Sequence, residues 1–229
     1  MRNILLFFMS SYKPTIQNGC YSRAQTNEAV LRKLQGNKDT RPDMILALCS
    51  ESVRNNADVN DLHGGANLTT QEYFTQIVLQ NANFPLQNFV SIPVPDTMNE
   101  SAQAAAIHDI VQNVQPGDTL YIDLSGGMRD TAMLFVAVAR YLRDIRDVTA
   151  HVLYTELVEG KPLLVRDSDK LYDLFDLISA TDEFFATGRT AVRLPARFRR
   201  QLPQDGYPAE QHREILGGSA ALQCGPPAG

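Results

Sequence analysis

The chain has 229 residues, of which 44% are hydrophobic and 21% are charged, and its formal net charge is −5. These values are close to the averages of soluble globular proteins, and a chain of this length can bury roughly 70% of its unfolded surface without a disulfide or a metal. The acidic balance, with no long basic run before position 189, argues against binding to duplex DNA or to an anionic membrane.

Cysteine spacing and the N-terminal residues indicate the compartment. Cys20, Cys49 and Cys224 are widely spaced and form no CxxC pair, which argues against a zinc site or a disulfide framework. The apolar stretch in residues 1–9 is too short to span a bilayer and lacks a signal-peptide cleavage pattern. We therefore expect a soluble cytoplasmic protein, without a membrane segment or a metal, in which Cys49 belongs to the core.

Short apolar runs alternate with helical patterns along the chain. Strands are predicted at residues 3–9, 43–49, 88–94, 119–124 and 148–155, with a shorter strand at 162–165. Helices are predicted between them, at residues 25–34, 70–81, 101–114 and 130–143. This alternation favours a Rossmann-like α/β fold, in which a largely parallel sheet has right-handed crossovers and helices on both faces.

The predicted helix 130–143 is apolar on almost its whole circumference, as the uninterrupted apolar run at residues 132–139 shows. A helix with so little polar surface has to be covered on more than one side. The sheet covers one side, and we expect a second subunit or a second domain to cover another.

The C-terminal region differs from the rest of the chain. A last helix is predicted at about residues 169–187, and after Gly188 arginine, proline and glycine become frequent while little apolar periodicity remains. We therefore assign residues 1–167 to an α/β domain, 168–188 to a linker helix and 189–229 to an irregular tail.

Two predicted strand ends are rich in small polar residues. Ser10 and Ser11 follow the first strand, and the segment Asp-Leu-Ser-Gly-Gly-Met-Arg at residues 123–129 leads from a strand into helix 130–143. Ligands of open parallel sheets bind beyond the carboxyl ends of the strands, where the strand order reverses. These two ends are therefore the candidate site.

The chemistry of segment 123–129 suits an anion. Gly126 and Gly127 would let the backbone approach a ligand closely, and the following helix start offers free N–H groups that attract phosphate. Ser125 could donate a hydrogen bond, and Arg129 could supply a positive charge. The same residues also suit a tight turn without a ligand, with Asp130 as the N-cap. The segment is neither GxGxxG nor GxxxxGK[ST], which disfavours nicotinamide cofactors and P-loop hydrolysis.

Segment 123–129 resembles the D-x-[ST]-x-G-x-[KR] signature of the CARF family, the CRISPR-associated Rossmann-fold sensor domains. Residues 19–21 and 25–30 look like the ligand-side loop and the first helix of CARF effectors. Residues 172–188 are similar to the segment where such effectors pass into a HEPN ribonuclease domain. The resemblance therefore extends over residues 1–188.

The resemblance implies a two-fold homodimer that binds cyclic oligoadenylate, the second messenger of type III CRISPR antiviral defence, across its axis. It implies no other cofactor. Ser10 and Ser11 would contact the ligand from the first strand end, and the loop at 125–129 would face its phosphates. The implied ligand-binding residues are Ser10, Ser11, Asn27, Ser125, Gly126, Gly127, Met128 and Arg129.

The chain departs from CARF–HEPN effectors after Gly188. HEPN ribonucleases use an R-x4-6-H motif, whereas the histidine that follows Gly188 is His212, and the nearest preceding arginine, Arg200, is too far from it. We therefore expect no ribonuclease activity in this chain and a truncated or missing HEPN part.

Two other functions fit the same residues. Some CARF domains slowly cut the ring they bind by positioning a ribose 2′-OH for in-line attack on the neighbouring phosphate, which would make the chain a ring nuclease. The other alternative is an unrelated Rossmann-like enzyme that acts on a nucleotide or a sugar phosphate.

The remaining polar residues form no evident catalytic set. His63 is interpreted as a solvated loop residue, and His108 and His151 as packed core or edge residues. No histidine pair has metal-ligand spacing, and no Ser-His-Asp set can be assigned from the order of residues. Asp123 is interpreted as a structural carboxylate that anchors the turn rather than as a base.

Overall fold

The structure is a computed structural model that describes residues 1–11, 15–17, 20–22, 26–57, 59–60, 67–127, 129–156, 164–170, 172–175, 177–178 and 181. Side chains are described for all of these except 15–17, 20–22, 60 and 129. Contacts divide the chain into two units, Met1–Tyr172 and Asp173–Gly229. The described residues of the second unit are helical, and the predicted tail at 189–229 lies outside the described residues.

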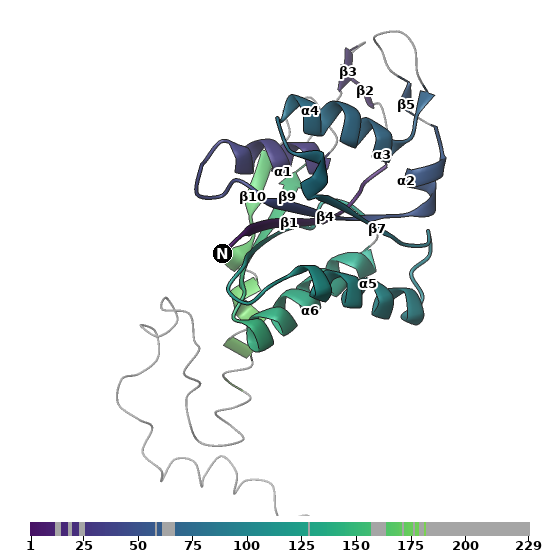
Figure 1. The fold of residues 1–229 in the computed structure, drawn as a ribbon. Helices are drawn as coiled ribbons and strands as arrows, with labels where there is room; N and C mark the ends of the chain where they lie inside the picture. The colour runs from purple at the N-terminus through teal and green to yellow at the C-terminus, as the bar shows by residue number, and fades with distance from the viewer. Residues whose placement is uncertain are drawn as a thin grey trace, which may run out of the picture. The chain divides into compact units, whose positions relative to one another are not determined.

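The first unit is built on a six-stranded sheet, which confirms the predicted α/β class (Figure 1). Its strands, in spatial order, are β10 (Leu164–Asp167), β9 (Thr149–Glu156), β8 (Thr119–Asp123), β1 (Asn3–Phe8), β4 (Met44–Cys49) and β7 (Phe89–Pro93). Neighbouring strands pair in parallel except β9 and β10, which pair antiparallel. The sheet is therefore largely parallel, as predicted, with one antiparallel edge.

The strand order reverses between β1 and β8. From β1 the chain builds outward through β4 to β7, and then helix α5 (Glu100–Asn113) returns it to the other side of β1, where β8 and β9 follow. The two central strands run in register, with Phe7 opposite Asp123, so their carboxyl ends lie side by side. This reversal is the place where open α/β sheets bind their ligands.

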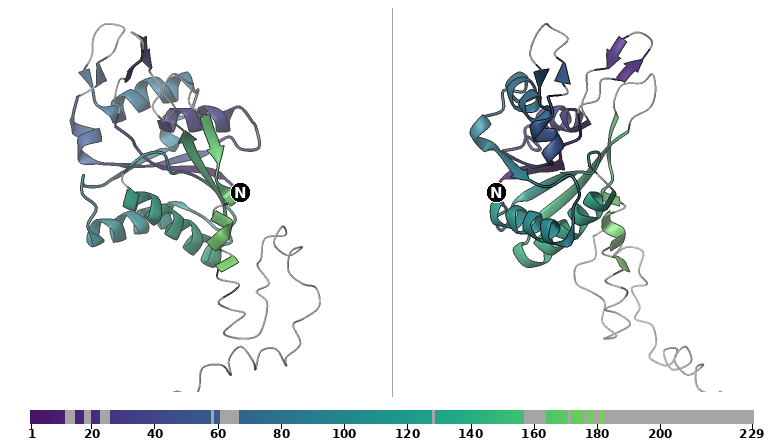
Figure 2. Two further views of the ribbon diagram at one scale, coloured as in Figure 1. Left: turned by 180° about the vertical axis from the view of Figure 1, so that it is seen from behind. Right: turned by 90° about the vertical axis from the view of Figure 1, so that its right-hand side faces the viewer.

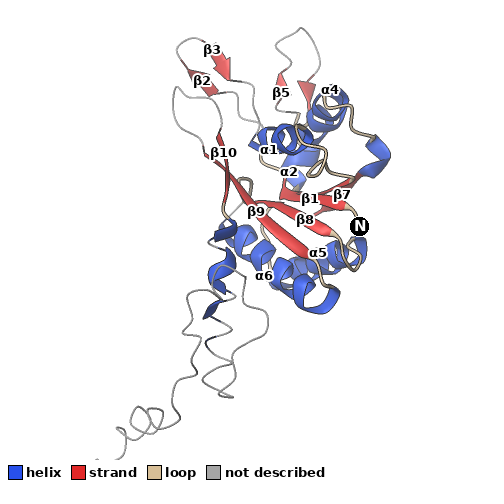
Figure 3. Cartoon of the chain, turned by 90° about the vertical axis from the view of Figure 1, so that its left-hand side faces the viewer, coloured by secondary structure: helices blue, strands red, loops and turns tan. Residues whose placement is uncertain are grey.

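Alternating side chains of β1 enter two separate cores. Ile4, Leu6 and Phe8 pack on one face of the sheet against α5 and α6 (Arg129–Arg146). The intervening residues of β1 pack on the other face against α1 (Thr26–Gln35) and the helical segment that starts at Thr70. Figures 2 and 3 show these helices on opposite faces of the sheet. Because β1 is buried on both faces, its sequence reads as a continuous apolar run.

The predicted helix 70–81 contains a π-helical stretch. It consists of α3 (Thr70–Tyr73), a π-helix at Phe74–Val78 and α4 (Leu79–Asn81), and it begins with a capping box between Thr69 and Glu72. Phe74 and Val78 are buried, but Ile77, three positions after Phe74, is 38% exposed. The wider π turn aligns residues four or five positions apart rather than three, which turns Ile77 outward.

Helix α5 packs on the sheet through Ala106 and Ile110, which are buried, and through Ile107 and Val111, which contact the same core. Ala104 and His108 are exposed. The prediction that His108 is a packed residue was therefore wrong. Three consecutive alanines at 104–106 make the apolar pattern of this helix ambiguous, so its rotation could not be read from the sequence.

Several short elements lie outside the predicted set. They are β2 (Thr15–Gln17), β3 (Cys20–Ser22), α2 (Glu51–Asn55), β5 (Val59–Asn60), β6 (Asn67–Leu68) and the 3-10 helix Leu86–Asn88. Each is too short to produce a periodic pattern. Within the described ranges, no helix combines the length and apolar character that a bilayer crossing requires.

Polar contacts join β9 to the residues that follow β10. His151 stacks on Tyr121 and pairs with Asp169 at 2.7 Å, and Asp169 also accepts the N–H of Val152 at 2.6 Å. The hydrogen bond that His151 donates to the Asp169 carboxylate raises the pKa of His151. His151 is thus a packed edge residue, as predicted. Cys49 is fully buried in the core, as predicted, and burial raises its thiol pKa to about 11.

A nearly buried carboxylate, Asp118, fastens the start of β1 to the turn before β8. The Arg2 guanidinium donates to Asp118 Oδ2 at 2.6 Å, and the N–H groups of Arg2 and Gln115 donate at 3.0 and 2.9 Å. Burial alone would raise the pKa of Asp118, but these hydrogen bonds and the Arg2 charge hold it below its usual value. Ionised Asp118 therefore stabilises the folded state.

We expect Asp118→Asn to lower the free energy of unfolding near neutral pH by about 2 kcal/mol. Because the folded-state pKa is lowered, this contribution is present above the ordinary carboxyl pKa and is lost as the pH falls through the folded value. Urea unfolding should therefore show the difference from wild type shrinking between about pH 5 and about pH 2. Asp39→Asn, at an exposed carboxylate, is the control. A difference independent of pH would contradict the assignment.

Candidate functional site

The turn that follows β8 packs directly on the end of β1. We call residues 125–127 the glycine turn. A Cβ on Gly126 would lie 2.1 Å from the carbonyl oxygen of Phe8, and one on Gly127 would lie 2.7 Å from the Phe8 ring. Gly127 also has a φ of +85°, a left-handed conformation that favours glycine. Both glycines are therefore required by the packing of the turn on β1, whether or not a ligand is bound.

A fully buried carboxylate, Asp123, holds the glycine turn. Its Oδ1 accepts the N–H of Ser125 at 2.8 Å and also the Ser125 hydroxyl. Its Oδ2 accepts the side-chain amide of Asn27 at 2.8 Å. Burial raises the pKa of Asp123, and the hydrogen bonds from Ser125 and Asn27 oppose that shift. The interpretation of Asp123 as the anchor of the turn is confirmed.

Asn27 links this anchor to the end of β1. Its Oδ1 accepts the Ser10 N–H at 2.9 Å and the Ser10 hydroxyl at 3.1 Å, while its Nδ2 serves Asp123. Asn27 is fully buried, although it was predicted to contact the ligand. In this structure it positions Ser10 and Asp123 from beneath the site.

The Ser125 hydroxyl connects β8 to β9, and through Thr155 this connection continues to the start of α1. It donates to Asp123 and accepts the N–H of Thr155 in β9 at 2.6 Å, and the Thr155 hydroxyl donates to the carbonyl oxygen of Thr26 at 3.3 Å. Because the Ser125 proton is committed to Asp123, this hydroxyl can offer a ligand a lone pair but no hydrogen atom. Ser125 was predicted to donate a hydrogen bond to the ligand, but in this structure it donates to Asp123 instead.

A crevice of about 390 Å³ opens at the carboxyl ends of the central strands. Predicted site residues that line it are Ser10, Ser11, Ser125 and Gly127. Gly126, the middle residue of the glycine turn, is buried. Met128 and the side chain of Arg129 lie outside the described residues. The structure therefore brings four of the predicted residues to one cavity.

Three further residues of the crevice were missed by sequence reasoning. Ser50 and Ser52 follow β4, and Asp96 follows β7. Their positions after apolar strands were visible in the sequence, and the rule that ligands gather at strand ends applies to them as well. The prediction covered only the ends of β1 and β8, where small polar residues are most frequent.

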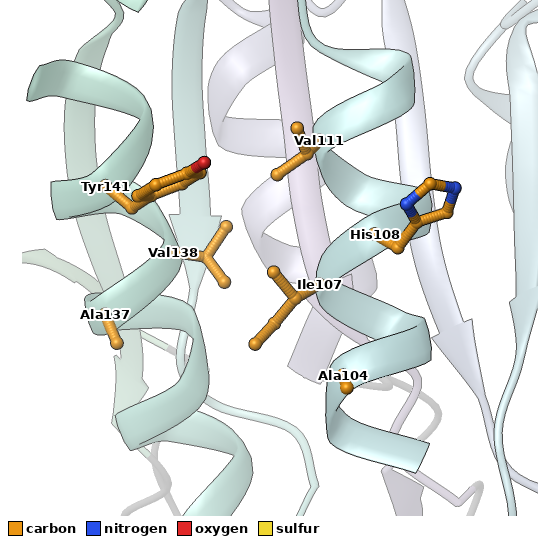
Figure 4. A pocket seen from close by; sticks show the side chains of 7 residues that line it. All are labelled: Ala104, Ile107, His108, Val111, Ala137, Val138 and Tyr141. Carbon is orange, nitrogen blue, oxygen red and sulfur yellow. The ribbon is translucent and has the colours of Figure 1, made fainter. Parts of the chain in front are cut away.

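A second cavity, the α5–α6 groove, has a different character. It measures about 460 Å³ and is lined by Ala104, Ile107, His108, Val111, Ala137, Val138 and Tyr141. Figure 4 shows Ile107 and Val138 extending toward each other from the two helices, with His108 pointing away. Such an apolar surface suits contact with another apolar surface rather than with a phosphate.

Among the residues that the structure describes, no group of three or more His, Cys, Asp and Glu side chains could hold a metal ion. The chain was compared with models of known protein families and with curated proteins, and neither comparison found a match. The crevice and the sequence pattern that forms its turn are therefore the features that bear on function.

Exchanging the two residue types tests whether Asn27 is the donor and Asp123 the acceptor of their hydrogen bond. Asp123→Asn places two amide groups against each other or leaves a donor of Ser125 without its acceptor, so we expect a loss of about 1–3 kcal/mol in the free energy of unfolding. The double variant Asn27→Asp with Asp123→Asn reverses the hydrogen bond and restores an acceptor for each donor. Urea unfolding should show the double variant more stable than the Asp123→Asn single variant. A double variant whose loss is the sum of both single losses would refute the network.

Proposed function

We propose that this chain is a CARF-type sensor domain that binds cyclic oligoadenylate at a site completed by a second copy. One observation carries the proposal. The segment that resembles the CARF signature forms the glycine turn at the strand-order reversal, and the turn shares its crevice with Ser10 and Ser11. The segment that carries the resemblance therefore lies at the position where open α/β sheets bind their ligands.

The chemistry of the turn suits a phosphodiester. Helix α6 has 18 residues and begins directly after the turn, so its first N–H groups and its dipole favour a negatively charged ligand there. The exposed Ser11 hydroxyl adds a neutral donor. Gly127 lines the crevice without a side chain, which leaves its backbone accessible to a ligand.

The size of the crevice supports a shared site. Pockets for small ligands range from about 300 to 1,000 Å³, and the crevice lies near the lower end. It has room for a single nucleotide unit but not for a ring of several adenylates. Two copies related by a two-fold axis would present two equivalent crevices to equivalent halves of one ring.

Helix α6 provides a surface for such a dimer. Met133, Tyr141 and Ile145 are 65%, 51% and 51% exposed, and Tyr141 also lines the α5–α6 groove. These residues lie on the helix that starts at the glycine turn. A dimer that buries them would cover the apolar surface that the sheet leaves open.

The size of the crevice also favours the second candidate, an enzyme that acts on a mononucleotide or a sugar phosphate within a single chain. Stoichiometry separates the two. A sensor takes up one ring for each two chains, whereas a mononucleotide enzyme binds one nucleotide for each chain. Recovery of the ring after binding separates a sensor, which leaves it intact, from a ring nuclease.

In calorimetric titration, we expect the protein to bind cyclic tetra- or hexa-adenylate with one ring per two chains. Ser11→Trp fills the crevice from an exposed position and should weaken binding by at least about tenfold, or about 1.4 kcal/mol. Ser101→Trp, at an exposed position of α5, should bind as wild type does. Equal thermal unfolding of both variants excludes misfolding as the cause. The proposal fails if wild type takes up neither ring at micromolar concentration.

We further expect Tyr141→Glu to convert the dimer into a monomer, because it places a charge in a desolvated interface. Size-exclusion chromatography with light scattering measures the mass. Gln80→Glu, at an exposed position among the helices over the opposite sheet face, is the matched control and should stay dimeric. A wild-type protein that is monomeric with and without ligand would contradict the dimer.

A further inference from the structure

The crevice has a second wall that the glycine turn does not reach. Ser50 and Ser52 stand at the end of β4, and their hydroxyl oxygens lie 3.0 Å apart. The N–H of Ser52 donates to Asp96 Oδ1 at 2.9 Å, which joins the loop after β7 to the start of α2. We call Ser50, Ser52 and Asp96 the acidic wall.

The acidic wall carries a carboxylate that stays ionised. The N–H of Ser52 holds the pKa of Asp96 below its ordinary value, and the Ser52 and Ser50 hydroxyls and the Arg54 charge act in the same direction. An ionised carboxylate accepts hydrogen bonds and donates none, and its two oxygens have about four acceptor positions in all. Asp96 therefore keeps acceptor capacity for a ligand, and it repels phosphate.

The two walls contact different parts of a ligand. The glycine turn packs on the end of β1 and Asp96 follows β7, and two strand spacings separate those strands in the sheet. At about 4.8 Å for each spacing the separation is roughly 10 Å. A single phosphate cannot contact both walls, whereas a nucleotide can extend from one toward the other.

We propose that Asp96 is a specificity residue that accepts a hydrogen bond from a donor group of the nucleotide, either a ribose hydroxyl or the adenine amino group. The inference rests on the proposed function for the identity of the ligand. The glycine turn then holds the phosphate, and the acidic wall distinguishes adenylate from nucleotides that lack the donor. A phosphate without a nucleoside would gain nothing from Asp96.

The test compares wild type, Asp96→Ala and Asp96→Asn in their binding of cyclic tetra-adenylate, its 2′-deoxy analogue and the corresponding ring of inosinates. We expect wild type to bind one of the two analogues about tenfold more weakly, or about 1.4 kcal/mol, because that analogue lacks the donor. Asp96→Ala should bind the natural ring more weakly than wild type by about the same factor. It should bind that analogue with the affinity that wild type has for it. Asp96→Asn retains an acceptor oxygen and should lose less. Asp39→Ala, at an exposed carboxylate away from the crevice, is the control.

The same comparison with adenosine, deoxyadenosine and inosine monophosphates separates the two proposals. Suppose that wild type binds the rings and that each Asp96 variant either binds every ring as wild type does or is weakened by the same factor for every ring. The specificity role is then refuted and the sensor function stands. If wild type binds only the mononucleotides, with Asp96-dependent discrimination, the specificity role stands and the sensor function is refuted. If no ligand binds, both are refuted.

Discussion

The site depends on one buried carboxylate. Asp123 sits without solvent contact at the end of a central strand, and the donors of Ser125 and Asn27 compensate for its lost hydration. Through Asn27 the same network extends to Ser10 on the neighbouring strand. Because every donor in it has an acceptor, the turn and the end of β1 are fixed relative to each other before any ligand arrives.

This arrangement explains why the turn has its particular sequence. Gly126 and Gly127 meet Phe8 too closely to carry a Cβ, so the turn can pack on β1 only with glycine at both positions. Ser125 is small enough to fold back on Asp123 and polar enough to receive Thr155. The residues of this motif are therefore needed first for the packing of the strand-to-helix turn. A ligand can contact only the backbone and hydroxyl groups that this packing leaves exposed.

The sequence predicted those parts of the structure that a strong local pattern determines. The apolar runs of β1 and β4 and the position of Asp123 were readable because central parallel strands are buried on both faces. The burial of Asn27 was not predicted, because a helical position near a strand end does not reveal whether the side chain faces the ligand or Asp123. Asp96 was missed although it follows a predicted strand, because the sequence does not reveal that β7 lies beside β4 and so brings Asp96 to Ser52.

The hydrogen bond from the Thr155 N–H to the Ser125 hydroxyl connects the crevice to β9, the strand next to β8. Thr155 belongs to β9, the strand whose residues His151 and Val152 hold Asp169. A molecule that displaced Ser125 would pull on β9 or break that bond. The crevice and Asp169, which follows β10 where the chain leaves the sheet, are therefore both held by the same strand, β9.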